Sequence, residues 1–260
     1  MRSILIHAEN GSAGKSRVET GLSLARMTDG HVTLLVDTPT AHYTAVDAMG
    51  GAMVATDALQ EAIASDDAFA REMDKRLAGQ DVTCTVLRAE TEPVAALTRA
   101  GRLADVVIIA RSDPMAGDLP LASRCAVLAV NDDKLLTFPL RSVGIAWDGS
   151  AEAAAAMRAA VPLLAGCGEV VVITVEDVPT EWPATDAVEY LSRHGVRAEL
   201  QVLPRIGSVE DTLSRELQLR GCEVLVMGAF GHSRIREFLF GGVTRSFLGN
   251  ADGPALLLAH

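Results

Sequence analysis

Two stretches of the chain share one order of strand, turn and helix signals, and this internal repeat constrains the fold more than any other feature. An offset of 138 residues places Gly11 on Gly149 and Gly30 on Gly168, with no gap over about 30 positions. In each stretch, an apolar run typical of a buried strand precedes a turn, a helical pattern and a second apolar run. These runs are 3–8 and 32–36 in the first stretch, and 143–147 and 170–175 in the second. A shared register of this kind indicates duplication of one supersecondary unit.

The later elements recur as well, but at a different offset. The run 104–110 corresponds to 222–228, an offset of 118, so the first copy has about twenty extra residues between its second and third strands. They fall within 38–80, whose middle (45–58) is rich in Ala, Gly and Met. We expect the Met and Ala positions around 49–53 to form core or an interface, with a ligand-gating flap as the less favoured alternative.

Each copy therefore reads βαβαβαβαβ, with final strands at 126–130 and 255–258. Strands that alternate with helices predict a parallel sheet covered by helices on both faces. The predicted fold class is α/β, with two tandem open parallel-sheet domains of the Rossmann-like, βαβ-repeat kind. We place the domains at 1–133 and 140–260, joined by a short polar linker at 134–139.

Composition is consistent with buried parallel strands and disfavours a nucleic-acid partner. Hydrophobic residues make up 49% of the chain but aromatic residues only 4%, so the core must be aliphatic. The net charge is −11, and no cluster of Lys and Arg supplies the basic face that nucleic-acid binding needs. An acidic surface of this kind indicates little beyond solubility.

Cysteine spacing and hydropathy indicate the cellular compartment in which we expect the protein. Four cysteines lie far apart, without the spacing of a disulfide framework or a zinc site: Cys84, Cys125, Cys167 and Cys222. The chain enters an apolar strand pattern at once, without a signal-peptide core, and no apolar stretch reaches the roughly 18 residues of a membrane span. We expect a cytoplasmic protein with no membrane partner.

A glycine pattern follows the apolar run 224–227. It reads Gly228-x2-Gly231-x9-Gly241, with Gly242 directly after. Glycines between a strand and a helix let backbone N–H groups approach phosphate, because they tolerate positive φ and carry no Cβ. The spacing predicts an α/β nucleotide binder. The alternative is a tight strand-to-helix turn without a ligand.

Two further segments of the second copy should lie at the same edge of the sheet. Ligands of open parallel sheets bind beyond the carboxyl ends of the strands, where the strand order reverses. Asp148 follows the first strand of this copy, and Val175 ends the second. The Asp148 carboxylate can accept hydrogen bonds from ribose hydroxyls or an adenine edge. Its alternative role is the N-cap of the following helix.

Three segments of the second copy resemble the universal stress protein family in its tandem two-domain form: AWDGS (146–150), GAFGHSRIREFLFGGVTR (228–245) and PALLLAH (254–260). The resemblance extends over nearly the whole chain by pattern, but the motif matches lie only in the second copy. It implies an α/β fold, and it implies ATP binding through a G-x2-G-x9-G-[S/T] signature.

The resemblance assigns roles residue by residue. Gly228, Gly231 and Gly241 match the glycines that hold the phosphates. Asp148 would sit at the ribose and adenine end, and the Val175 backbone would touch adenine. The implied cofactor is ATP or a related adenine nucleotide, with or without Mg²⁺. In this family the same loop also serves a purely architectural role.

One position departs from the signature. The Ser or Thr expected after Gly241 is Gly242, so a hydroxyl donor to phosphate is lost. Such a hydrogen bond to a charged group contributes about 1.5–3 kcal/mol. The N–H groups of Gly242 and Val243 remain, and Thr244 carries a hydroxyl two residues later.

The first copy lacks these features. Asn10 stands where the second copy has Asp148, and 111–120 holds no glycine pair with a long spacer. Its Gly14-Lys15-Ser16 suggests a phosphate-binding P-loop, but that motif requires Gly or Ala where this chain has Glu9. We expect a structural copy without a nucleotide, and an ATPase that uses Lys15 is the least favoured reading.

Catalytic and metal-binding patterns are absent from the linear sequence. His232 follows Gly231 and could serve as a general base, but a solvated loop histidine is the favoured interpretation. The six histidines show no metal-ligand spacing, so no metal site and no catalytic residue is predicted.

Taken together, the residues predict a stress-response, ATP-binding protein that acts as a binding or signalling module with little or no turnover. Its partners are an adenine nucleotide and a protein partner or second copy. The alternative is a nucleotide-free interaction protein whose halves pack through edge strands and the insert.

Overall fold

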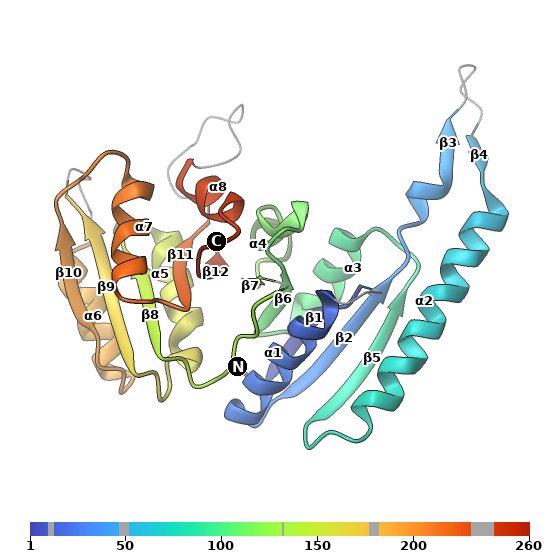
Figure 1. Ribbon diagram of the computed structural model, residues 1–260, viewed down its shortest axis with the longest axis horizontal. Helices are drawn as coiled ribbons and strands as arrows, with labels where there is room; N and C mark the ends of the chain where they lie inside the picture. Colours follow the sequence, from blue (N-terminus) through green and yellow to red (C-terminus); the bar gives the residue numbers. More distant parts are fainter. Residues whose placement is uncertain (10–12, 47–51, 132, 177–181, 230–241) are drawn as a thin grey trace.

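One continuous sheet of ten strands runs through the described part of the molecule (Figure 1). The computed structural model describes residues 1–260 except 10–12, 47–51, 132, 177–181 and 230–241. The sheet consists of β1 (Ser3–His7), β2 (His31–Asp37), β5 (Thr83–Ala89), β6 (Val106–Ala110), β7 (Ala126–Val130), β8 (Ser142–Ala146), β9 (Glu169–Val175), β10 (Glu199–Leu203), β11 (Val224–Gly228) and β12 (Ala255–Ala259).

Each half of the chain supplies five parallel strands. The strand order is β10-β9-β8-β11-β12-β7-β6-β1-β2-β5, and the halves meet where β12 pairs with β7. That one junction is antiparallel, with Leu257 opposite Leu128. The predicted α/β fold with two tandem parallel βαβ repeats is confirmed. The merging of both repeats into one sheet was not predicted.

Helices cover both faces of this sheet, as the alternating pattern predicted. They are α1 (Ala13–Thr28), α2 (Thr56–Leu77), α3 (Pro93–Ala100), α4 (Leu119–Ser123), α5 (Ala151–Ala160), α6 (Ala184–Arg193), α7 (Val209–Leu219) and α8 (Gly242–Gly249). Buried residues of α1, α2, α5 and α6 form one aliphatic core, and those of α3, α4, α7 and α8 form the other. Side chains of one strand alternate between the two faces, so each strand contributes to both cores. Because the sheet is continuous, both cores cross the junction between the halves.

The extra residues of the first copy form a hairpin and a long helix. The strands β3 (Thr44–Val46) and β4 (Ala52–Val54) pair antiparallel and project beyond the main sheet at the upper right of Figure 1. The chain then enters α2, which has 22 residues, whereas its counterpart α6 has 10. Residues 47–51 and the side chains of the hairpin lie outside the described residues, so the predicted interface or flap around 49–53 stays a prediction.

None of the helices in the described part of the chain combines the length and hydropathy that a bilayer-spanning segment needs.

Candidate functional site

The candidate site lies at the carboxyl edge of the second half, where the strand order reverses. β8 is flanked by β9, which follows it in the chain, and by β11, which comes later. Such a reversal point is where open parallel sheets bind ligands. Asp148 follows β8, Val175 ends β9 and Gly228 ends β11, so the predicted segments end at this one edge.

Asp148 shapes the turn from β8 into α5. Its Oδ1 accepts the backbone N–H of Ser150 at 2.9 Å, and Gly149 between them has φ +78°, which favours glycine. The N-cap of α5 is Ser150, whose Oγ accepts the N–H of Ala153 at 3.1 Å. The alternative role of Asp148 as N-cap is therefore wrong. Its carboxylate instead holds the loop that precedes the cap.

Gly228 lies against the first turn of α5. A Cβ at this position would come within 2.6 Å of the Ala153 nitrogen and 2.7 Å of the Glu152 carbonyl carbon. Those contacts are too short for real atoms, so only glycine lets β11 and α5 approach this closely. Gly228 thus has an architectural role whether or not a phosphate binds beyond it.

Val175 places backbone groups beyond the end of β8. The Ile173 carbonyl accepts the N–H of Trp147 at 2.8 Å, and this bond closes the pairing of β9 with β8. Alternate residues of a strand direct their backbone groups to the same side, so Val175 faces the β8 side, as Ile173 does. Glu176, the next residue, bonds to Leu203 on the opposite side. The Val175 backbone is therefore oriented toward the space above β8, while its side chain is buried.

The last predicted residues lie at the start of α8. Gly242 opens this helix and is exposed, and a Cβ there would meet no described atom within 4 Å. The first N–H groups of any helix lack intrahelical partners, so Gly242, Val243 and Thr244 offer backbone donors at this end. Thr244 is 3% exposed, so its side chain is shielded from solvent. Gly231, Gly241 and His232 lie outside the described residues.

The P-loop-like segment of the first half is held by an ion pair at the position of Glu9. The Glu9 carboxylate forms an ion pair with the fully buried Arg17 at 2.7 Å, and Arg17 also donates to the His7 carbonyl at 3.0 Å. Lys15 is exposed on α1. A carboxylate held in an ion pair occupies the position where a P-loop has Gly or Ala. Asn10 is outside the described residues.

A buried charged cluster beside this segment was missed by the sequence reasoning. His7, at the end of β1, is 2% exposed and contacts Asp37 at 2.7 Å through Nε2 and Asp113 at 3.5 Å through Nδ1. Burial by itself lowers the pKa of the His7 imidazole. The carboxylates of Asp113 and Asp37, with the charge of Glu9, outweigh it and raise that pKa to about 9. The linear sequence gives no sign of this cluster, because His7 and Asp37 end β1 and β2 while Asp113 follows β6.

A cavity of about 670 Å³ lies between the halves. The first half contributes Arg111, Asp113 and Asn131 to its wall, and the second contributes α8 and the loop after it. The buried Arg111 guanidinium crosses the junction and donates to the carbonyls of Phe247 and Pro254. Neither Asp148 nor Val175 lines this cavity, so it is distinct from the candidate nucleotide site.

Comparison with known proteins finds a similar family for the second half and a similar fold for the whole chain. Residues 139–259 match the sequence model of the Universal stress protein family. A universal stress protein from Archaeoglobus fulgidus is similar in structure, with a TM-score of 0.72 and 13% identity over 99% of this chain and 96% of that one. A protein from Pseudomonas aeruginosa described as functionally unknown has a TM-score of 0.62 and 14% identity, over 100% and 92% of the two chains. No curated protein sequence matches. Residues 139–259 are therefore similar in sequence to the universal stress protein family, and over its whole length the chain has the fold of the Archaeoglobus fulgidus protein.

Proposed function

We propose that the second half, residues 140–260, is a domain that binds ATP or a related adenine nucleotide and acts as a binding or signalling module. The observation that carries this proposal is the convergence of Asp148, the Val175 backbone and Gly228, at the ends of β8, β9 and β11, on one reversal point of the sheet. The match of this half to the family model supports the same assignment.

Each part of the edge suits one part of the nucleotide. The Val175 backbone groups beyond β8 can pair with an adenine edge. The Asp148 carboxylate, held beside the Ser150 N–H, can accept hydrogen bonds from ribose hydroxyls. The first N–H groups of α8 carry the positive end of the helix dipole and suit phosphate.

These contacts favour binding over turnover. Backbone N–H groups stabilise a bound phosphate but do not activate a water molecule, and general-base catalysis needs a positioned side chain within hydrogen-bond reach. Hydrolysis should therefore be slow. The nucleotide would act by shifting the protein between two states for which it has different affinities.

A thermal-shift titration with ATP, ADP and AMP, with and without Mg²⁺, tests this proposal. A ligand that binds only the folded state raises its stability by about 2.7 kcal/mol at a hundredfold excess over Kd. We expect a saturable rise in Tm that increases with the number of phosphates. No rise with millimolar ATP would overturn the proposal.

The Gly242→Ser variant tests the phosphate end directly. Open space around Gly242 accepts a side chain, and the new hydroxyl restores the donor that the family signature contains. A hydrogen bond to a charged group contributes about 1.5–3 kcal/mol, so ATP affinity should rise about 10- to 100-fold. Gly242→Ala is the matched control, because it adds the same Cβ without a donor. Equal ATP affinity in the two variants would place the phosphates elsewhere.

The two alternatives predict different results in the same titration. An ATPase that uses Lys15 predicts that Lys15→Ala abolishes the nucleotide response, whereas the proposed site predicts no change. A nucleotide-free interaction protein predicts no response to any nucleotide. The projecting β3–β4 hairpin is the feature that favours this second function (Figure 1).

A further inference from the structure

The buried cluster in the first half has the chemistry of a metal site. His7, Glu9 and Asp113 each offer one ligand atom, and these atoms lie within 4.8 Å of one another. We propose that they bind a divalent transition-metal ion, such as Zn²⁺ or Mn²⁺, through His7 Nδ1 and one carboxylate oxygen each of Glu9 and Asp113. This site lies beyond the ends of β1 and β6, at the reversal point of the first half.

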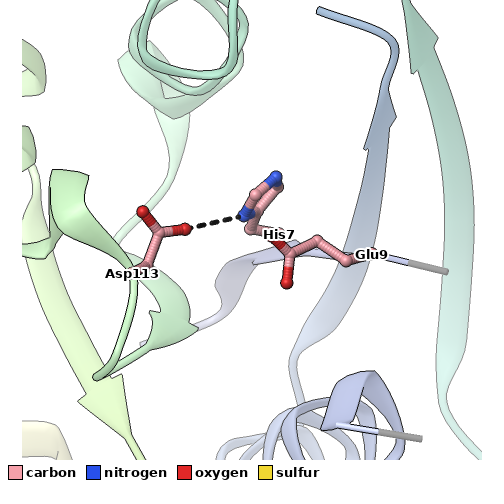
Figure 2. A group of neighbouring side chains, drawn as sticks. All are labelled: His7, Glu9 and Asp113. Carbon is pink, nitrogen blue, oxygen red and sulfur yellow. Dashed lines mark ion pairs between the residues drawn. The ribbon is translucent and has the colours of Figure 1, made fainter. Parts of the chain in front are cut away.

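The spacing of His7 Nδ1 and Asp113 Oδ2 fits a shared ion better than a hydrogen bond. Asp113 faces His7 from the loop after β6, and the Glu9 carboxylate turns toward the same space (Figure 2). The Nδ1–Oδ2 distance of 3.5 Å is long for a hydrogen bond, and within the described part of the chain Nδ1 makes none. Two ligands of a tetrahedral ion with bonds of about 2.1 Å lie about 3.4 Å apart.

Neighbouring groups hold the ligands in orientation. Asp37 Oδ1 lies 2.7 Å from His7 Nε2, which fixes the ring and directs Nδ1 at Asp113. Asp113 Oδ1 accepts the N–H of Met115 at 2.9 Å, so Oδ2 is the oxygen that faces His7. A carboxylate on the far nitrogen of a histidine is the usual support of a metal-bound imidazole.

Charge balance also favours a cation. Among the described residues, the cluster holds the carboxylates of Glu9, Asp37 and Asp113 against the guanidinium of Arg17 and the imidazole of His7. The side chains of Asp37 and Asp113 are 5% and 8% exposed, and unpaired charges are costly at such depth. With His7 protonated, one negative charge is in excess, and a divalent ion that replaces the Nδ1 proton makes the cluster neutral. Binding displaces the Nδ1 proton to solvent, as metal binding to histidine requires.

The ligand atoms limit the choice of ion, and the exposure of Glu9 allows an ion to enter from solvent. Imidazole nitrogen suits zinc and other transition metals, and carboxylate oxygen suits manganese. The Glu9 side chain is 51% exposed, which gives an ion a route from solvent. One Glu9 oxygen pairs with Arg17, and a carboxylate has a second oxygen for the ion.

The test uses the full chain, freed of metal with a chelator and without nucleotide, so that its result is independent of the proposed nucleotide site. Mn²⁺ binding is followed by electron paramagnetic resonance and Zn²⁺ binding by calorimetry. We expect one Mn²⁺ per chain. His7→Gln keeps an amide that can reach Asp37 but removes the Nδ1 ligand, and should weaken affinity about 10- to 100-fold.

Two further variants make the outcome decisive. Glu9→Gln changes a half-exposed ligand and should weaken affinity at least about tenfold while leaving the fold intact. His31→Gln is the matched control, because His31 lies at the opposite end of β2 from Asp37 and its imidazole lies 3.0 Å from the Thr85 hydroxyl, away from the cluster. Absence of bound Mn²⁺ and Zn²⁺ would overturn the proposal. So would affinities that His7→Gln and Glu9→Gln leave unchanged.

Discussion

At the scale of single residues, Arg220 connects three elements of the second half. It ends α7 and donates to Glu169 at 2.6 Å, to Glu199 through two bonds of 3.0 Å, and to Glu216 at 2.6 Å. The hydrogen bonds to Glu199 head the causes that raise the pKa of the guanidinium, and the same contact lowers the pKa of Glu199 below its usual 4.5. Arg220 thereby joins the start of β9 and β10 to α7.

We predict that Arg220→Gln lowers the free energy of unfolding by about 1–2 kcal/mol at neutral pH, after allowance for solvent screening. Because the pKa of Glu199 is lowered by folding, its contribution is present above pH 4.5 and is lost as the pH falls below that value. Urea unfolding from pH 7 to pH 3 should therefore show a shallower acid slope in the variant. Arg193→Gln, which breaks an exposed pair with Glu189, is the control with little effect. Equal slopes in wild type and Arg220→Gln would contradict the argument.

At the scale of elements, the contact between β11 and α5 positions the candidate site. Gly228 ends β11 directly against Glu152 and Ala153, in the first turn of α5. The Asp148 loop and the end of β11 are thereby held at the same edge. The first glycine of the family signature thus has a packing reason that is independent of phosphate.

Gly228→Ala should destabilise the second half by about 1–3 kcal/mol, because the added Cβ meets backbone atoms that cannot rotate away. The midpoint of urea unfolding measures this loss. Gly242→Ala adds the same methyl group in open space at the start of a helix, so it should be neutral or slightly stabilising. If the two variants unfold at the same urea concentration, the close approach of β11 and α5 does not require glycine.

At the scale of the whole molecule, the two halves are coupled by more than the chain that connects them. The pairing of β7 with β12 makes one sheet from two repeats, and both aliphatic cores run across the junction. Arg111 reaches from the first half to the carbonyls of Phe247 in α8 and of Pro254, which precedes β12. Burial lowers the pKa of this guanidinium to about 10, which shows that forming the contact costs desolvation free energy.

Arg111→Met should lower the free energy of unfolding by about 2 kcal/mol or more, because it leaves two carbonyls without their donor. The substitution should also weaken the coupling between the halves. Trp fluorescence reports on Trp147 and Trp182 of the second half, whereas circular dichroism reports on the whole chain. The two unfolding transitions should therefore no longer coincide. Arg102→Met, at an exposed position, is the control. Coincident transitions at the wild-type midpoint would show that Arg111 does not couple the halves.

The sequence by itself determined the repeat and its elements. Four strands per half appear where the apolar runs predict them, the five-strand pattern of each half is confirmed, and the predicted offset of 118 relates β6 to β11. The reason is local: period, turn residues and glycines act within a few positions of the chain. The glycine pattern and Asp148 are local signals of the same kind, and they predicted the candidate site. The alternative role of Asp148 as N-cap was wrong, because Ser150 caps α5.

Only the tertiary structure decided how the halves join and which distant side chains meet. The antiparallel pairing of β7 with β12 depends on the edges of two completed sheets, and no local pattern specifies which edges pair. His7, Asp37 and Asp113 show no ligand spacing along the chain, yet they meet because three parallel strands end at one edge. A carboxylate is stable in water without a partner, but its burial costs free energy unless a cation lies beside it. This cost is a property of the tertiary structure and cannot be read from the sequence.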